Sequence, residues 1–198
     1  MPRKKLILSN KFYYHITSRS NHQHWFTIPL QQVWQIAVEA MIFSLDKHIA
    51  EIAQFVLMSN HYHLIIKTTG CTISDFMQTF NKFFSDKLRK ESKLKNRMFG
   101  GRYRFSLITK QSYLLNAYLY VYQNPLRAKI TNICEDYPYS TLWYESRNIK
   151  CPFQYSPFII FDVDIKSQLN RPLQDDLFLQ MQKGFSKSTF KYVFQRKY

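Results

Sequence analysis

Two apolar stretches joined by only two residues place the strongest constraint on how this chain can fold. Residues 49–58 and 61–68 each have the composition of a β-strand, and only Ser59 and Asn60 lie between them. A two-residue connection is suited to a β-hairpin. The sequence therefore predicts two adjacent antiparallel strands here.

The elements around this hairpin predict a ferredoxin-like fold. Residues 11–18 alternate as a strand, residues 100–109 predict another strand, and apolar residues at helical spacing predict helices over 28–47, 72–90 and 111–124. The first six elements follow the split βαβ order. We predict an α+β fold with a four-stranded antiparallel sheet, helices on one face and a further helix after the fourth strand. We expect the other face to stay open, as in many proteins that bind single-stranded nucleic acid.

The clear pattern of elements ends near residue 145. We therefore predict a principal domain over residues 1–145 and a C-terminal extension, basic and aromatic, over residues 146–198. Residues 182–198 mix basic with aromatic side chains. They are consistent both with an arm that binds nucleic acid and with a helix that has one solvated face.

The charge of the chain favours a polyanionic partner. It carries 28 Lys and Arg against 13 Asp and Glu, which gives a formal net charge of +15. An excess of this size attracts nucleic acid. The 4 glycines argue against a glycine-rich phosphate loop. A basic protein with no such partner is the alternative.

The spacing of the cysteines and the length of the apolar segments indicate in which cellular compartment the protein resides. Three cysteines lie far apart at Cys71, Cys134 and Cys151, which fits neither a disulfide framework nor a zinc ribbon. They suit a reducing cytosol, so we predict a cytoplasmic protein. No segment has the length of a membrane span, and we expect no membrane partner.

A pair of histidines opens the strand predicted over residues 61–68. His61 and His63 flank Tyr62, and strand alternation places both imidazoles on one side, roughly 6.5–7 Å apart. Two such rings can converge on one metal ion. The spacing alone is weak, because His22 and His24 share it in a polar stretch. A hydrogen-bonded pair that binds no metal is the alternative.

The third helix carries a stripe of polar residues. Tyr113, Ala117, Tyr120 and Asn124 fall on one helical face, and Tyr120 and Asn124 are neighbours at i and i+4. An ordinary packed face with hydroxyls at its rim is one interpretation. The other is chemical, because a phenol would lie beside an amide oxygen.

These two features form one candidate site if the helix packs near the strand. His61, His63 and Asn124 would then hold a divalent ion, with Tyr120 beside it as a nucleophile. Two nitrogens and one oxygen, completed by water and phosphate oxygens, suit Mg²⁺ or Mn²⁺ better than a closed zinc site.

Together these residues resemble a known family, the single-tyrosine transposases of the His-hydrophobic-His (HUH) superfamily. The branch they resemble most is that of the repeat-associated tyrosine transposases. The resemblance covers about residues 10–145 and follows the order of the family's motifs. The matching segments are "FVLMSNHYHLII", "GGRYRFSLI", "YLYVYQNPLRAKI" and "EDYPYSTLWY".

The resemblance implies that residues 1–145 form a catalytic domain that binds single-stranded DNA, often next to a hairpin. It implies that His61 and His63 bind the metal, Asn124 is the third ligand and Tyr120 is the nucleophile. Relatives act as monomers or as homodimers, and both are open here. The chain departs from the family at Tyr62, where an aliphatic residue is usual, and after "NPLRA", where a lysine replaces a small residue.

The reaction that the resemblance implies is metal-assisted transesterification through a 5′-phosphotyrosine. A 3′-hydroxyl leaves, and the strand can be rejoined without ATP. Arg102 and Arg104 alternate with Tyr103 in the fourth strand and are predicted to contact DNA, although exposed structural arginines are equally consistent. His15 has the same phase in the first strand and is a further predicted DNA contact.

Two other functions fit the same residues. A non-catalytic module would bind single strands, with steep salt dependence and no covalent adduct. A metal-dependent hydrolase would use water as its nucleophile and would trap no protein on DNA. A tyrosine one turn from a candidate ligand favours the transposase-like reaction.

Overall fold

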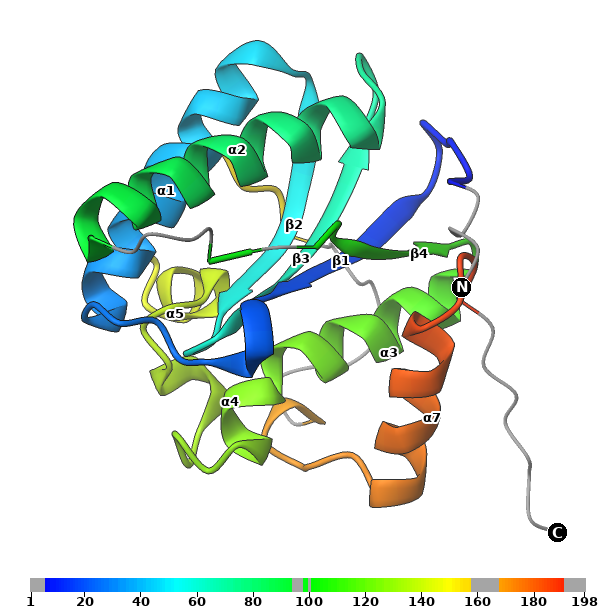
Figure 1. Cartoon of the computed structure of the whole chain (residues 1–198). Coiled ribbons are helices and arrows are strands. Elements are labelled where there is room, and N and C mark those ends of the chain that lie inside the picture. Colours follow the sequence, from blue (N-terminus) through cyan, green and yellow to red (C-terminus); the bar gives the residue numbers. More distant parts are fainter. Residues whose placement is uncertain (1–5, 94–97, 100, 158–167, 191–198) are drawn as a thin grey trace, which may run out of the picture.

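Four antiparallel strands in the order β2-β3-β1-β4 form the sheet around which the chain is arranged (Figure 1). The computed structural model describes residues 6–93, 98–99, 101–157 and 168–190. The strand order and the antiparallel pairing confirm the predicted ferredoxin-like α+β fold. The strands are β1 (Tyr13–Arg19), β2 (Ala50–Leu57), β3 (His61–Thr68) and β4 (Arg104–Ile108).

Helices α1 (Leu30–Lys47) and α2 (Ile73–Ser92) cover one face of the sheet, as predicted. The even-numbered residues of β3 turn toward this layer. Tyr62, Leu64 and Ile66 are completely buried there, in a core shared with both helices. Strand alternation therefore places the apolar half of β3 against α1 and α2 and its histidines on the opposite face.

Local chemistry fixes where the two helices begin. Pro29 directly precedes α1, where its fixed φ suits the start of a helix. The Thr72 hydroxyl accepts a hydrogen bond from the backbone N–H of Asp75, and the Asp75 carboxylate accepts one from the backbone N–H of Thr72. This capping box satisfies donors that the first turn of α2 leaves unpaired.

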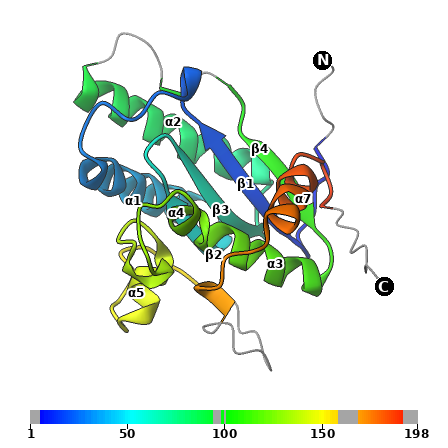
Figure 2. The same cartoon turned by 90° about the horizontal axis from the view of Figure 1, so that it is seen from below.

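The second face of the sheet is also covered, which corrects the expectation that it stays open. Helices α3 (Gln111–Tyr122) and α7 (Asp175–Phe185) pack there, and Figure 2 shows both in front of the sheet. The physical reason is that this face carries buried apolar residues such as Ile65 and Ile108, which form a second core with α3 and α7. The other short helices are η1 (Asn21–Gln23), α4 (Asn124–Arg127), η2 (Cys134–Asp136) and α5 (Thr141–Ser146).

Later parts of the chain bond to both edges of the sheet. On the β4 edge, the backbone N–H of Leu107 donates to Ser188 at 2.9 Å, and that of Phe190 donates to the Leu107 carbonyl at 2.8 Å. On the β2 edge, the backbone N–H of Leu57 donates to Tyr139 at 2.9 Å. These bonds occupy edge groups that would otherwise be open to pairing with another chain.

The predicted extension over residues 146–198 packs on the sheet wherever it is described. Its residues Phe153 and Phe185 belong to the first and second core, respectively. Residues 158–167 and 191–198 lie outside the described part, so the predicted boundary near 145 and the role of the last residues stay predictions. No helix within the described ranges is long and apolar enough to cross a membrane.

Lys129 adopts a left-handed backbone with φ of 56°. It follows α4 in the position of a C-terminal helix cap. Its backbone N–H donates to Leu126 at 3.0 Å, and the N–H of Ile130 donates to Pro125 at 3.0 Å. This pair of bonds is the Schellman motif, in which glycine is favoured because it has no Cβ.

We therefore predict that Lys129→Gly stabilises the protein. Removing the Cβ relieves the left-handed strain and should raise the free energy of unfolding by about 0.5–1 kcal/mol, measured by urea denaturation. Lys129→Ala is the matched control, because it removes the charge and keeps the Cβ. Equal stabilities of the glycine and alanine variants would contradict this explanation.

Candidate active site

A cavity of 920 Å³ opens on the second face of the sheet, between the strands and α3, α4 and α7. Residues from five separate parts of the sequence line it. The residues predicted from sequence are all among them: His15, His61, His63, Arg102, Arg104, Tyr120 and Asn124. The fold therefore brings the strand histidines together with Tyr120 and Asn124 of the helix stripe, within one chain.

The two histidines of β3 lie on the cavity side of the sheet, as alternation predicts. Their ring centroids are 5.1 Å apart, and the rings are nearly perpendicular at 81°. His61 is half-buried, whereas His63 is only 5% exposed. The pair is thus less open to solvent than expected, because α3 and α7 cover this face.

A hydrogen bond to Asn60 determines the tautomer of His61. The Asn60 amide nitrogen donates to the carbonyl of Gln23 at 2.8 Å, so its amide oxygen is the atom that lies 2.6 Å from Nδ1 of His61. An amide oxygen only accepts, and Nδ1 must therefore carry the hydrogen. The lone pair of His61 then resides on Nε2, which is the arrangement found in metal-binding histidines.

Burial keeps the histidines of the site neutral. Desolvation lowers the pKa of His61 to about 4, with a further contribution from the positive charge of Arg19. Desolvation also lowers the pKa of His63 well below its usual value, and His61, His15 and Arg19 add to the effect. A neutral imidazole is the form that binds a metal ion.

Tyr120 of α3 lies against the histidines and beneath α7. Its ring meets His63 edge-on, with centroids 5.8 Å apart, and stacks on Phe178 at 5.0 Å. The side chain is 6% exposed. Burial raises its pKa to about 12, although a hydrogen bond from Gln182 and the charges of Arg19 and Arg127 act in the opposite direction. The phenol is therefore protonated at neutral pH.

The neighbouring tyrosines of α3 point elsewhere, as their helical phase predicts. Tyr118 and Tyr122 pack edge to face with centroids 4.8 Å apart, and the Tyr122 hydroxyl lies 2.8 Å from that of Thr141. Neither lines the cavity described above. The geometry thus separates Tyr120 from the two residues nearest to it in sequence.

Asn124 presents its amide oxygen as a possible ligand. Its amide nitrogen donates to the carbonyl of Tyr120 at 2.7 Å and to that of Val121 at 3.3 Å. The oxygen is then the atom left for a cation. Within the described ranges no three His, Cys, Asp or Glu side chains are grouped as ligands. The chemistry of His61, His63 and Asn124, two imidazole nitrogens and one amide oxygen, is of a kind that suits Mg²⁺ or Mn²⁺.

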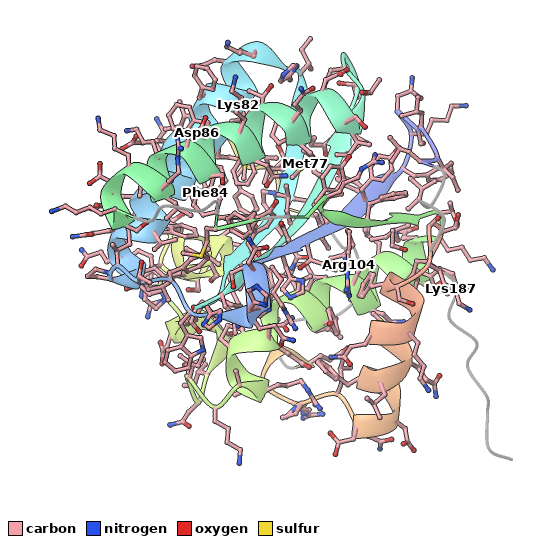
Figure 3. The ribbon with its side chains drawn as sticks, in the orientation of Figure 1. Met77, Lys82, Phe84, Asp86, Arg104 and Lys187 are labelled. Atoms are coloured by element: carbon pink, nitrogen blue, oxygen red, sulfur yellow. The ribbon has the colours of Figure 1, made fainter. Side chains whose placement is uncertain are left out.

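Arginines give the rim of the cavity its charge. Arg102 and Arg104 are exposed while Tyr103 is buried, as predicted, and Figure 3 shows Arg104 on the side of the sheet that faces α3. Arg19 and Arg127 also line the cavity and were not predicted. Strand alternation and helical spacing could have predicted both, because Arg19 continues the alternation of β1 and Arg127 continues the stripe of α3.

His15 lines the cavity, but little of its surface is exposed, and its DNA contact stays a prediction. Its side chain is 2% exposed, and Phe185 packs against it with ring centroids 4.0 Å apart. The alternation of side chains along β1 correctly placed His15 on the cavity face of the sheet. The sequence of β1 contains no signal for the helix that covers it.

Sequence reasoning also missed the residues that α7 contributes to the site. Phe178, Gln182 and Phe185 line the cavity and contact or surround Tyr120. Arg127 connects this helix to α4. Its guanidinium lies 3.8 Å from the centroid of the Phe178 ring and 2.7 Å from the Asp175 carboxylate. The helix therefore forms one wall of the site.

We predict that the buried histidines make the stability of the metal-free protein depend on pH. Burial lowers the pKa of His15 to about 3, against an ordinary value of 6.5 that the unfolded chain regains. The unfolded state then binds more protons below pH 6.5, so the free energy of unfolding falls as pH falls from 6.5 toward 4. Each such histidine contributes up to ~1.4 kcal/mol per pH unit.

Urea denaturation between about pH 7 and 5 measures this slope. His15→Phe should flatten it by roughly one bound proton. His24→Asn, which alters an exposed histidine, should leave it unchanged. An unaltered slope in His15→Phe would refute the account.

Comparisons with known proteins agree with this fold. Residues 9–124 match the family described as IS200-like transposases. The solved structure of a REP-associated tyrosine transposase bound to a REP hairpin superposes with a TM-score of 0.64 at 18% identity, over 82% of this chain and 96% of that one. A putative transposase from Deinococcus radiodurans R1 gives a TM-score of 0.41 at 14% identity, over 60% of this chain and 94% of that one. The curated proteins contain no match.

Proposed function

Because the chain belongs to the family of IS200-like transposases, we propose that it cleaves and rejoins single-stranded DNA through a covalent bond to Tyr120. The observation that carries this proposal is the placement of the Tyr120 ring against His63 in the cavity that His61 and Asn124 also line. A phenol next to a set of cation ligands is the constellation that phosphoryl transfer to tyrosine requires.

His61, His63 and Asn124 are the residues that would hold a divalent cation, Mg²⁺ or Mn²⁺. A bound cation supplies charge neutralisation at the scissile phosphate and polarises its oxygens. The chain prepares these ligands itself. Burial keeps both imidazoles neutral, Asn60 orients His61, and the backbone of α3 orients Asn124.

The reaction exchanges one phosphodiester for another. The Tyr120 oxygen forms a bond to phosphorus while the bond from phosphorus to the 3′-oxygen breaks, and the phenolic proton is balanced by the proton that the leaving 3′-hydroxyl gains. The product is a 5′-phosphotyrosine, whose retained bond energy allows rejoining without ATP. The raised pKa of Tyr120, about 12, means that the phenol loses its proton only as the attack proceeds.

The rim of the cavity is suited to a phosphate backbone. Arg19, Arg104 and Arg127 line it from β1, β4 and α4, and Arg102 lines it from the segment just before β4. Guanidinium groups bridge phosphate oxygens well. The related transposase in the solved structure is bound to a hairpin, and we propose that a hairpin flanks the cleaved strand here too. All of the proposed residues come from one chain, so a monomer suffices.

The direct test is formation of the covalent adduct. The full-length protein with Mn²⁺ and end-labelled single-stranded DNA that contains a hairpin should give a denaturant-resistant protein–DNA band. Tyr120→Phe should abolish this band, because no phenolic oxygen is left to attack. Removal of the metal by a chelator should abolish it as well.

Tyr118→Phe is the matched control, because Tyr118 lies on the same helix and faces away from the cavity. This variant should retain the adduct. An adduct of equal yield in Tyr120→Phe would reject the nucleophile. Cleavage without any adduct would favour hydrolysis by water.

One observation favours a second candidate, a module that binds single strands and does not cleave them. Tyr120 is 6% exposed and His63 is 5% exposed, so a phosphate does not reach them in this arrangement without movement of the walls. Such a module would keep the arginine rim and its affinity for DNA. It would show binding in every condition and an adduct in none.

Both candidates predict that Arg104 contributes to DNA binding through charge. Arg104→Ala should weaken binding to single strands of any sequence and should lower the slope of log affinity against log salt by about 1. Fluorescence anisotropy over a salt series measures this. Lys90→Ala, an exposed residue of α2 on the opposite side of the sheet, should leave the slope unchanged. Equal salt slopes in the Arg104 variant and the wild type would show that Arg104 does not contact the DNA.

A further inference from the structure

The buried imidazole of His15 has no part in the reaction proposed above. It lies on β1, next to β3, with its Nε2 at 2.9 Å from Nδ1 of His63. The two rings are nearly parallel, at 20°, with centroids 5.1 Å apart. Phe185 of α7 packs against His15 on the cavity side. The two neutral rings thus share a hydrogen bond in a place from which water is largely excluded.

We propose that His15 is a positioning residue that holds His63 in the tautomer able to bind a cation. A neutral imidazole carries one N–H, and one ring nitrogen keeps its lone pair. If Nδ1 of His63 donates to Nε2 of His15, the lone pair of His63 lies on its own Nε2. The reverse arrangement places the hydrogen on Nε2 of His63, where it would exclude a metal ion. This inference rests on the proposed function.

The charge of the cavity favours the first arrangement. Arg19, Arg104 and Arg127 line the same cavity as His63. Positive charge there repels an N–H that points toward it and attracts a lone pair. The partner of the inward Nδ1–H is then Nε2 of His15, the acceptor at 2.9 Å.

The neighbouring strand offers a partner for the remaining nitrogen of His15. With Nε2 accepting, Nδ1 of His15 must carry a hydrogen. In the register of β1 and β4, Ser106 lies directly opposite His15 on the same face. Its hydroxyl is buried and has no hydrogen-bond partner among the described residues. The Ser106 hydroxyl is not bonded to His15 in this structure, and a change of its rotamer toward Nδ1 would be needed to complete a polar chain across β4, β1 and β3.

The two β3 histidines are then oriented in the same way by different partners. His61 uses the amide oxygen of Asn60, and His63 uses the imidazole of His15. In each case Nδ1 is occupied inside the protein and Nε2 is left for the cation. Residues in such supporting positions typically change metal affinity by ~10–100-fold when they are removed.

The first test needs no variant. Long-range ¹⁵N–¹H NMR spectra of the full-length, metal-free protein distinguish the two tautomers of each histidine. We expect His61 and His63 both to carry the hydrogen on Nδ1. A hydrogen on Nε2 of His63 would overturn the proposal.

The second test measures Mn²⁺ affinity from the EPR signal of the free ion. His15→Phe keeps a ring of similar size and removes the acceptor, so Mn²⁺ should bind ~10–100-fold more weakly. His15→Gln places an amide oxygen near the original Nε2 and should restore most of the affinity. His48→Phe, a histidine between α1 and β2 that bonds to Thr79, should leave the affinity unchanged.

His61→Ala separates failure of this inference from failure of the proposed function. If His61→Ala weakens Mn²⁺ binding and His15→Phe does not, the role of His15 is overturned and the metal site stands. If the wild type and His61→Ala bind Mn²⁺ equally poorly, the metal site fails, and the role of His15 fails with it. If circular dichroism shows that His15→Phe is unfolded, the tautomer of His63 in the wild type and the Mn²⁺ affinity of His15→Gln decide whether His15 positions His63.

Discussion

The pairing of β1 with β3 is the interaction on which the candidate site depends. In this register Thr17 lies opposite His63 and His15 lies opposite Ile65, which brings the two buried imidazoles within hydrogen-bonding distance across the strands. A slip of one residue would turn every side chain of β3 to the other face. Tyr62 and its even-numbered neighbours prevent this slip, because they fill the core under α1 and α2. Apolar packing on one face of the sheet therefore sets the chemistry on the other.

Sequence reasoning correctly predicted the features that depend on the periodicity of a single strand or helix. Alternation placed His61 and His63 on one face, and helical phase selected Tyr120 over its neighbouring tyrosines, because both signals are local to one element. The covering of the second face was not predictable in this way. Ile65 faces a helix that begins far along the chain, at Asp175, after a stretch with no clear pattern. Nothing in β1 or β3 indicates which distant segment packs on them, and so the open face was expected wrongly.

Burial has opposite consequences for the two kinds of group in the site. It keeps His61 and His63 in the neutral form that a cation requires, and it opposes ionisation of Tyr120. The positive charge of the arginines lowers the pKa of both kinds of group, so it reinforces the first effect and opposes the second. A protein that used only its own residues would thus hold good ligands beside a poor nucleophile. This imbalance is a physical reason why the proposed chemistry would need a bound cation, which His61, His63 and Asn124 would hold.

The bonds between β4 and the segment after α7 have a consequence for how the protein is made. Leu107 pairs with Ser188 and Phe190, and Phe178 closes over Tyr120. During synthesis the sheet and its α1–α2 layer can assemble as soon as β4 has emerged, whereas the second core lacks its last wall until the chain has been made as far as Phe190. We expect a nascent chain to carry an exposed patch around Ile65 and Ile108 for that interval, with the tyrosine not yet enclosed. We therefore expect the site to be completed only after Phe190 has been made.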